Sequence, residues 1–109
     1  MYQFAEVNMS TTVVLTINRA DNELIALLNG IIVYDKKTDG NPSLNDVVNL
    51  TNLVTSGDNI LTLLGINWGD EADYAGTLTV DATTTTWGAS YKNTANGLAW
   101  SDVIHIHVS

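Results

Sequence analysis

The sequence predicts an all-β protein, an antiparallel β-sandwich of about eight strands that forms one domain over residues 1–109. Three observations predict it. The length suits a single domain, and a chain of this size buries roughly 65% of its unfolded surface, enough for a core without disulfides. Thr, Asn, Val, Ile and Leu are abundant while Pro occurs once, a composition typical of strands and tight turns. Short segments bounded by turn residues recur along the chain, and none has the 3.6-residue apolar period of a long helix.

The first part of the chain is expected to hold three strands, at Thr12–Asn18, Glu23–Leu28 and Ile31–Tyr34. In the first of these, large apolar side chains occupy every second position, so one face is predicted to point into a core. Asn29-Gly30 follows the second strand and supplies two residues that tolerate positive φ angles, as a type I′ turn requires. The second and third strands are therefore expected to pair as a hairpin.

The middle of the chain is expected to contain a long polar loop at Asp35–Asn45, a short strand at Asp46–Leu50 and a longer strand at Asn59–Ile66. Residues Thr51–Ser56, between the two strands, are predicted to form a single helical turn that Gly57 closes in a left-handed conformation. The longer strand is apolar at both alternating sets of positions, which predicts a central strand buried on both faces.

The remaining strands are predicted at Thr77–Asp81, Thr83–Tyr91 and Ser101–Val108. The first two form a hairpin, and the last alternates strictly between apolar and polar positions. A polar loop at residues 67–74 precedes the first of these strands, and a second polar loop at residues 92–98 precedes the last. Trp87 is expected in the core, because Trp is highly buried on average.

Charge and motif content exclude several classes of function. The chain has 12 acidic residues and 4 Lys or Arg, a formal net charge of −8, which would repel the phosphates of a nucleic acid. No segment approaches the roughly 20 unbroken apolar residues of a membrane span, so membrane insertion is not expected. Cys is absent, which excludes disulfides and thiolate chemistry. The sequence lacks a phosphate-binding loop, a nucleophile elbow and a His-Glu-x-x-His motif, so no enzyme activity is expected.

Motifs between residues 21 and 67 resemble the galactose-binding-domain-like jelly roll. An acidic turn at Asp21-Asn22-Glu23 leads to a strand that ends in Asn29-Gly30, and Asn49-Leu50-Thr51 stands before Gly57-Asp58-Asn59-Ile60-Leu61, which opens the longer strand. The family's pattern has Asp at the position of Asn49. The resemblance implies a jelly roll of about eight strands and carbohydrate binding, as in carbohydrate-binding modules and small bacterial lectins. The shared motifs belong to the scaffold, so they bear on the fold more directly than on the function.

Aromatic and polar residues of the expected loops form the candidate sugar-binding set. The C–H patches of a pyranose stack on aromatic faces, and its hydroxyls need polar partners. The candidates are Trp68, Asp70, Tyr74, Tyr91, Asn93 and Trp100. Structural alternatives remain open: Trp68 as an anchor packed on the rim of the sandwich, and Asn93 as a residue that holds a turn. If Trp68, Tyr91 and Trp100 meet at one end of the sandwich, they form an aromatic cleft.

Metal binding has three candidate locations. Asp70 and Asp73 could bind Ca²⁺, but the loop at residues 67–74 lacks the acidic spacing of a dedicated Ca²⁺ site, and solvated side chains are the alternative. Asp35, Asp39 and Asn41 offer oxygen ligands that suit Ca²⁺, and the alternative is a solvated turn with two lysines offsetting the acids. His105 and His107 project to the same side of a strand, but a zinc site needs further ligands, so exposed strand residues are the expectation. The cofactor expectation is therefore none, or Ca²⁺.

The leading hypothesis is a non-catalytic carbohydrate-binding module or small lectin, and a homo-oligomer is possible because a second copy would cover an edge strand. The alternative is a structural or adhesive β-sandwich that mediates protein–protein contact. Residues 1–7 lack the basic region and apolar stretch of a signal peptide. An extracellular or periplasmic setting therefore follows only from the sugar-binding hypothesis.

Overall fold

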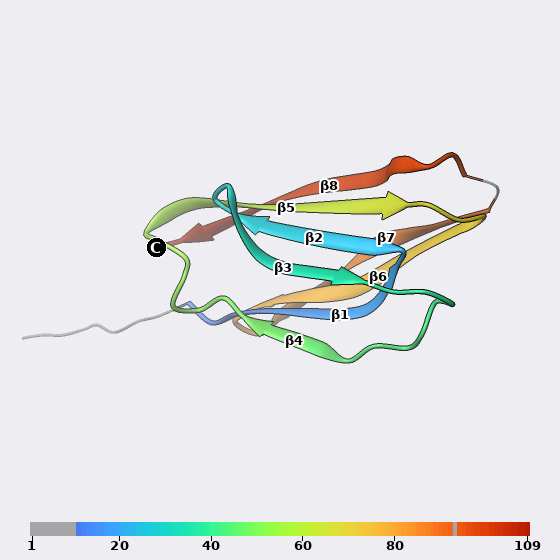
Figure 1. The fold of residues 1–109 in the computed structure, drawn as a ribbon. Coiled ribbons are helices and arrows are strands. Elements are labelled where there is room, and N and C mark those ends of the chain that lie inside the picture. Colours follow the sequence, from blue (N-terminus) through green and yellow to red (C-terminus); the bar gives the residue numbers. More distant parts are fainter. Residues whose placement is uncertain (1–10, 93) are drawn as a thin grey trace, which may run out of the picture.

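The computed structural model describes residues 11–92 and 94–109 and is an all-β sandwich (Figure 1). Over these residues, eight strands form two four-stranded antiparallel sheets. They are β1 (Val13–Asp21), β2 (Glu23–Leu28), β3 (Ile31–Lys37), β4 (Asp46–Asn49), β5 (Gly57–Asn67), β6 (Glu71–Val80), β7 (Thr83–Lys92) and β8 (Gly97–Val108). The predicted sandwich of about eight strands is confirmed, and its two layers are compatible with a jelly-roll-like fold.

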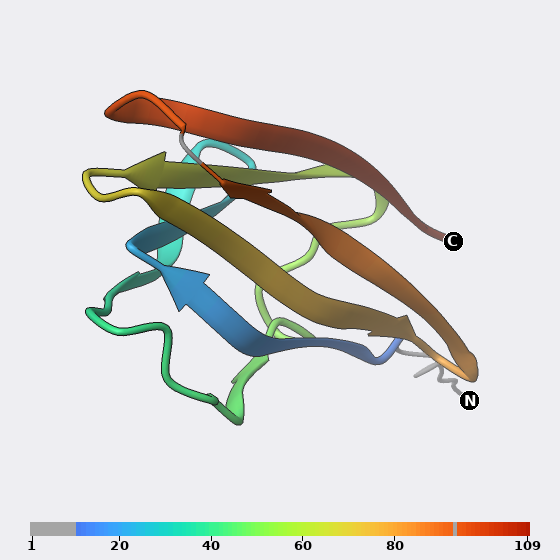
Figure 2. The ribbon, with the colours of Figure 1, turned by 90° about the vertical axis from the view of Figure 1, so that its right-hand side faces the viewer.

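The strand order is β4-β1-β6-β7 in the first sheet and β3-β2-β5-β8 in the second. The connections β1–β2, β3–β4, β5–β6 and β7–β8 all cross between the sheets at the same end of the sandwich (Figures 1 and 2). We call this end the loop end. Strands β7 and β8 are edge strands of different sheets and follow each other in the chain, so they border the same open side of the sandwich.

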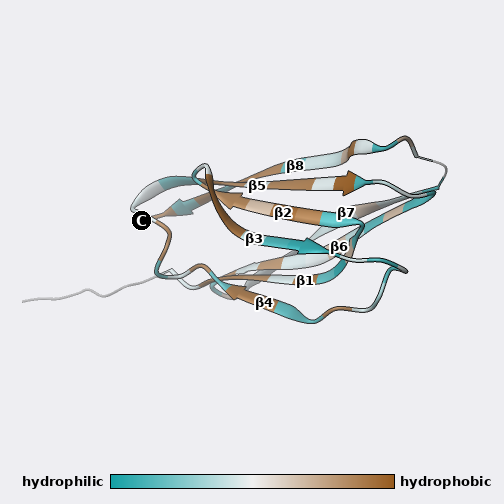
Figure 3. Ribbon diagram, viewed as in Figure 1, coloured by the Kyte–Doolittle hydropathy of each residue, from teal (hydrophilic) through white to brown (hydrophobic). Residues whose placement is uncertain are grey.

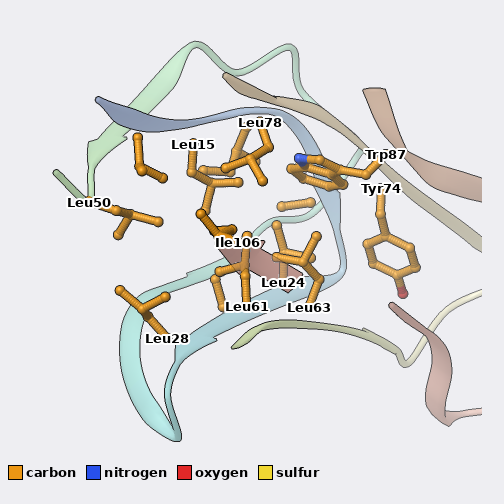
Figure 4. Close-up of a cluster of buried hydrophobic side chains, with 14 of the residues drawn as sticks. Leu15, Leu24, Leu28, Leu50, Leu61, Leu63, Tyr74, Leu78, Trp87 and Ile106 are labelled. Carbon is orange, nitrogen blue, oxygen red and sulfur yellow. The ribbon is translucent and has the colours of Figure 1, made fainter. Parts of the chain in front are cut away.

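The core between the sheets consists mostly of aliphatic side chains from alternate strand positions (Figure 4). Its fully or almost fully buried members include Val13, Leu15, Ile17, Leu24, Leu28, Leu50, Leu61, Leu63, Leu78 and Ile106. Three of them are the alternating residues of β1 that the sequence predicted to face inward. Trp87 is buried at 7% exposure, as predicted, and it lies with Tyr74 beside the aliphatic cluster.

The short connections follow the expected turn chemistry. Asn29 and Gly30 have φ angles of +52° and +83°, which confirms the hairpin turn between β2 and β3. The N–H groups of Leu53 and Val54 both donate to the carbonyl of Leu50, at 2.9 and 3.2 Å, and so form the expected turn before β5. Gly57 has a φ of +92°, which only glycine adopts freely.

The prediction that the long strand is buried on both faces is wrong for one of them. Strand β5 is central in its sheet, and Leu61 and Leu63 are fully buried on its inner face. On the opposite face, however, Ile60 is 43% exposed. In a two-layer sandwich each sheet is covered on only one side, so a strand that is apolar on both faces leaves one of them uncovered.

The predicted loop at residues 67–74 is also too long. Strand β6 begins at Glu71, and Tyr74, which the sequence placed in that loop, is fully buried inside the sandwich. Small residues at inner positions, Ala72 and Gly76, hid the alternation of this strand. Similarly, β8 begins at Gly97, and β3 continues to Lys37.

Residues 11–92 and 94–109 contain no helix long and apolar enough to cross a membrane.

Candidate ligand-binding site

Hydrogen bonds tie the connections at the loop end to one another. The side-chain carbonyl of Asn22 accepts the N–H of Trp68 at 2.8 Å, and its backbone carbonyl accepts the N–H of Thr38 at 2.6 Å. Asn22 in the β1–β2 turn therefore holds both the β3–β4 loop and the β5–β6 loop. Asn22 and Thr38 are buried, so these bonds are shielded from water.

Asn67 performs the same role for the β7–β8 connection. Its side chain is 1% exposed, and its Nδ2 donates to the carbonyls of Gly69 at 2.8 Å and Thr94 at 3.0 Å. The N–H of Thr94 in turn donates to the carbonyl of Asp70 at 3.3 Å. Asn67 was not among the residues predicted from the sequence to shape this end of the sandwich, although an Asn at the end of a strand before Trp68-Gly69 indicates a structured loop.

Three aromatic rings from three strands form a stack inside this end of the sandwich. The ring of Trp100 (β8) stacks on Tyr74 (β6) at a centroid distance of 5.8 Å and on Trp87 (β7) at 6.0 Å, with interplanar angles of 14° and 19°. We call these residues the aromatic stack. Because β8 belongs to one sheet and β6 and β7 belong to the other, the stack joins the two layers through favourable ring contacts.

Two glycines make room for the aromatic stack. A Cβ on Gly65 would lie 2.5 Å from the Tyr74 ring, and a Cβ on Gly76 would lie 2.3 Å from the Trp87 ring and 2.1 Å from the carbonyl oxygen of Thr16. Gly76 and Trp87 are direct cross-strand partners, so the indole folds over the glycine backbone. The orientation of the rings is thus fixed by the residues opposite them.

A cleft of about 320 Å³ opens between the edge strands beside this stack. It is lined by Tyr91 from β7 and by Leu98, Ala99, Trp100 and Ser101 from β8. Tyr91 is 38% exposed and Trp100 is half-buried. Trp100, whose ring stacks on Tyr74 and Trp87, is thus also one of the residues that line the cleft.

The structure brings together part of the predicted aromatic set. Tyr91 and Trp100 share the cleft, and Trp68 is 44% exposed at the same end of the sandwich, on the loop that Asn67 holds. Asp70 is exposed on that loop. The prediction that Tyr74 contacts a ligand is wrong, because Tyr74 is 1% exposed and lies in the core, where no ligand reaches it from the surface. Asn93 lies outside the described residues.

The hydroxyl of Tyr74 is buried and has no hydrogen-bond partner among residues 11–92 and 94–109, and the same holds for the indole N–H of Trp87. Burial, with smaller contributions from Asp21 and Tyr91, raises the pKa of Tyr74 to about 12. Tyr74 therefore stays neutral, and its hydroxyl is not an acid or base at ordinary pH.

Asp35, Asp39 and Asn41, which were suggested for Ca²⁺, lie on β3 and in the loop that follows it, and two of them contact other side chains. Asp35 lies on β3 opposite Ile25. The side-chain hydrogen bond between Asp35 and Glu23 is the largest cause of the raised pKa of Glu23, and burial is the next. The side-chain Nδ2 of Asn41 instead donates to the carboxylate of Asp73 on β6 at 2.8 Å, and the backbone carbonyl of Asn41 accepts a hydrogen bond from the Arg19 guanidinium at 2.6 Å. That guanidinium would repel a cation held by the same loop.

The described part of the chain holds no group of three or more His, Asp or Glu side chains placed to bind a metal. Asp39 is exposed in the β3–β4 loop. His105 and His107 are exposed on β8, and Nδ1 of His107 lies 3.1 Å from Oδ1 of Asp58.

A second groove, of about 450 Å³, lies at the opposite end of the sandwich. It is lined by Leu28, Asn29, Ile31, Ile32, Val33, Leu53 and Thr55. Ile31 and Leu53 are 70% and 53% exposed. This groove is mainly aliphatic, so it lacks the aromatic rings and the range of polar groups that suit a sugar.

No family model, curated protein or solved structure matches this chain.

Proposed function

We propose that this protein is a non-catalytic carbohydrate-binding domain whose site is the cleft between β7 and β8. The observation that carries the proposal is the placement of Tyr91 and Trp100 in one cleft at the loop end, where Trp68 is also exposed. The resemblance of residues 21–67 to galactose-binding-like domains supports the same function, as an analogy of scaffold.

The chemistry of the cleft suits a sugar ring. Tyr91 offers aromatic surface to the C–H face of a pyranose beside the half-buried Trp100, and the hydroxyls of Ser101 and Tyr91 are available to the sugar hydroxyls. Because the aromatic stack already fixes the Trp100 ring, binding loses little side-chain entropy there. The volume is at the lower end of the usual range for ligand pockets, about 300–1,000 Å³, which favours a single sugar unit.

The proposed site is non-catalytic because the residues that line the cleft include no carboxylate. Glycoside hydrolysis ordinarily needs two carboxylates on either side of the scissile bond. An open cleft covers only part of a ligand and gives weak monovalent binding, so avidity from several linked sites would be needed for tight attachment.

The test is a glycan array followed by titration of the best glycan into the wild-type protein and three variants. Tyr91→Ala and Trp68→Ala each remove an exposed ring and are expected to weaken binding at least about tenfold while the unfolding midpoint stays close to wild type. Thr84→Ala is the matched control, since Thr84 is exposed on β7 far from the cleft. EDTA is expected to leave binding unchanged, because the described residues hold no acidic cluster for a metal.

Two results would refute sugar binding at this cleft: no glycan retained by the wild type, or a bound glycan whose affinity is unaffected by both ring removals. A loss of binding in EDTA would instead require a calcium site. If Trp68→Ala alone is silent, the site is confined to the cleft and Trp68 is a loop anchor.

A structural or adhesive role is the second candidate function. The observation that favours it is the amount of large aliphatic surface outside the cleft, including Ile32 at 59% and Val103 at 52% exposure. Isolated surface aliphatics are ordinary, but a contiguous group of them marks an interaction surface.

A further inference from the structure

The outer faces of the two sheets have opposite character. On the outside of the β4-β1-β6-β7 sheet, Thr16, Thr77 and Thr86 are cross-strand neighbours. Beside them the hydroxyls of Thr79 and Thr84 are 2.9 Å apart. A polar outer face is what an antiparallel sheet exposed to water ordinarily shows.

The outside of the β3-β2-β5-β8 sheet is aliphatic instead. The register places Ile32, Leu27, Thr62 and Val103 in one row across its four strands. We define the aliphatic face as the outward-facing apolar residues of this sheet, namely Ile25, Leu27, Ile32, Ile60, Leu64, Ile66 and Val103. Figure 3 shows hydrophobic colour along much of β2 and β5, and at the start of β3.

The members of this face are exposed or half-buried within the chain. Ile32, Val103 and Ile60 are 59%, 52% and 43% exposed, and the other four are half-buried. The groove at the end opposite the loops shares Ile32 and continues the apolar surface around the edge of β3. Exposed apolar area of this extent is costly in water and is normally covered by a partner.

Charge is confined to the borders of the aliphatic face. At one corner Glu23, Asp35 and Lys37 lie together, with the ammonium of Lys37 3.9 Å from the Glu23 carboxylate. At the opposite end Asp58 is next to His107. Among the cross-strand partners of Leu27, Ile60 and Leu64, only His105 is ionisable, and it lies opposite Ile60 on the edge strand β8, although the chain as a whole has a net charge of −8. Repulsion between copies is therefore weak across this face.

We propose that the aliphatic face is the interface of a symmetric dimer, in which a second copy of this chain packs its own aliphatic face against it. Two copies related by a two-fold axis present the same patch to each other, so aliphatic surface meets aliphatic surface without any further partner. Stacked sheets pack about 10 Å apart, which lets side chains of this size interdigitate.

The size of the face supports a dimer. Four strands spaced by about 4.8 Å, over the roughly 20 Å between the positions of Ile60 and Ile66, give a projected area near 400 Å². The accessible area of a corrugated surface is larger, and the groove adds to it. The projected area alone is about half of the roughly 800 Å² per partner of a standard interface, which fits a weak dimer that forms at high protein concentration. The β7–β8 cleft lies at the side of the sheet, so this proposal does not depend on what the cleft binds.

The test compares one substitution on the two outer faces. Val103→Lys and Ile32→Lys place a charge on the aliphatic face, whereas Val47→Lys places it on the outer face of the other sheet, where Val47 is 61% exposed. Each variant changes the net charge from −8 to −7, so general electrostatic repulsion decreases equally in all three.

Sedimentation equilibrium over low micromolar to millimolar concentrations reads out the mass. The wild type and Val47→Lys are expected to approach twice the chain mass of 11.8 kDa as concentration rises, and more strongly at high salt. Val103→Lys and Ile32→Lys are expected to raise the dimer dissociation constant by roughly 100-fold or more, because each buries an unpaired charge at the interface. Circular dichroism confirms that every variant is folded.

Three outcomes would overturn the dimer. A wild type that stays monomeric throughout would assign the face to another partner. Equal loss of association in Val47→Lys would place the interface on the other sheet. A dimer that persists in Val103→Lys and Ile32→Lys would show that copies meet elsewhere.

Discussion

Replacing Gly65 with Ala tests whether the aromatic stack controls the stability of this end of the sandwich. The new Cβ would lie 2.5 to 2.7 Å from three atoms of the Tyr74 ring. Carbon atoms attract best at about 3.5–4.0 Å, so the ring would have to shift by roughly 1 Å or more. Tyr74 is 1% exposed and stacks on Trp100, so it has no free space to enter.

Overpacking of this kind costs about 1–3 kcal/mol, and the lower entropy of an unfolded Ala chain offsets about 0.4–1 kcal/mol of it. We therefore expect Gly65→Ala to lower the free energy of unfolding by about 1–2 kcal/mol, which a domain with a stability of about 5–15 kcal/mol survives. Urea unfolding followed by Trp fluorescence measures the loss, and near-UV circular dichroism reports the disturbed stack.

Gly69→Ala is the matched control, because the nearest atom to its new Cβ is Oδ1 of Asn22 at 3.7 Å, an ordinary contact. Its unfolding free energy should stay within about 0.5 kcal/mol of wild type. In a Tyr74→Leu background the cost of Gly65→Ala should shrink by about 1 kcal/mol or more, since the obstructing ring is gone. The packing argument is refuted if Gly65→Ala and Gly69→Ala unfold at the same urea concentration.

Two further substitutions probe buried polar groups. Tyr74→Phe removes a buried hydroxyl that has no partner among the described residues, so it should be neutral or stabilise the protein by up to about 1 kcal/mol in urea unfolding. A decrease in the free energy of unfolding of more than about 1 kcal/mol would show that the hydroxyl forms a hydrogen bond. The second is Glu23→Gln. A side-chain hydrogen bond to Asp35, with burial, raises the pKa of Glu23 above its ordinary 4.5, so the protonated form is favoured in the folded state. The corresponding stability is present below about pH 4.5 and is lost as pH rises through the folded pKa. Relative to wild type, Glu23→Gln should therefore gain stability between pH 4.5 and pH 7 in paired urea titrations, and a relative loss over that range would contradict the assignment.

Local rules predicted much of the scaffold. Alternation in β1 identified its inner face, Asn29-Gly30 identified a hairpin, and the preference of Trp for the interior placed Trp87. Asn59, in the motif that opens the longer strand, bonds local backbone, since its Nδ2 donates to the carbonyl of Thr55 at 2.8 Å. These features depend on residues close together in the chain, which is why a sequence expresses them.

The candidate site was only partly predictable. The ring of Trp100 meets Tyr74 and Trp87 across two sheets, and no spacing in the chain encodes such a contact. Tyr74 was assigned to the surface because Asp70, Glu71 and Asp73 stand next to it, yet the alternation of β6 turns it inward. Acidic residues indicate that the outward positions of a strand face water. They do not determine whether the residues between them point into the core.

The sequence by itself determined that the chain is all-β and acidic, and that its long strand is apolar on both sides. Only the tertiary structure decided which side of that strand is covered. Each sheet of a two-layer sandwich meets the other with one face, so the burial of a side chain depends on the arrangement of all eight strands. The same arrangement left Ile60 and Val103 exposed and drew Tyr74 into the core.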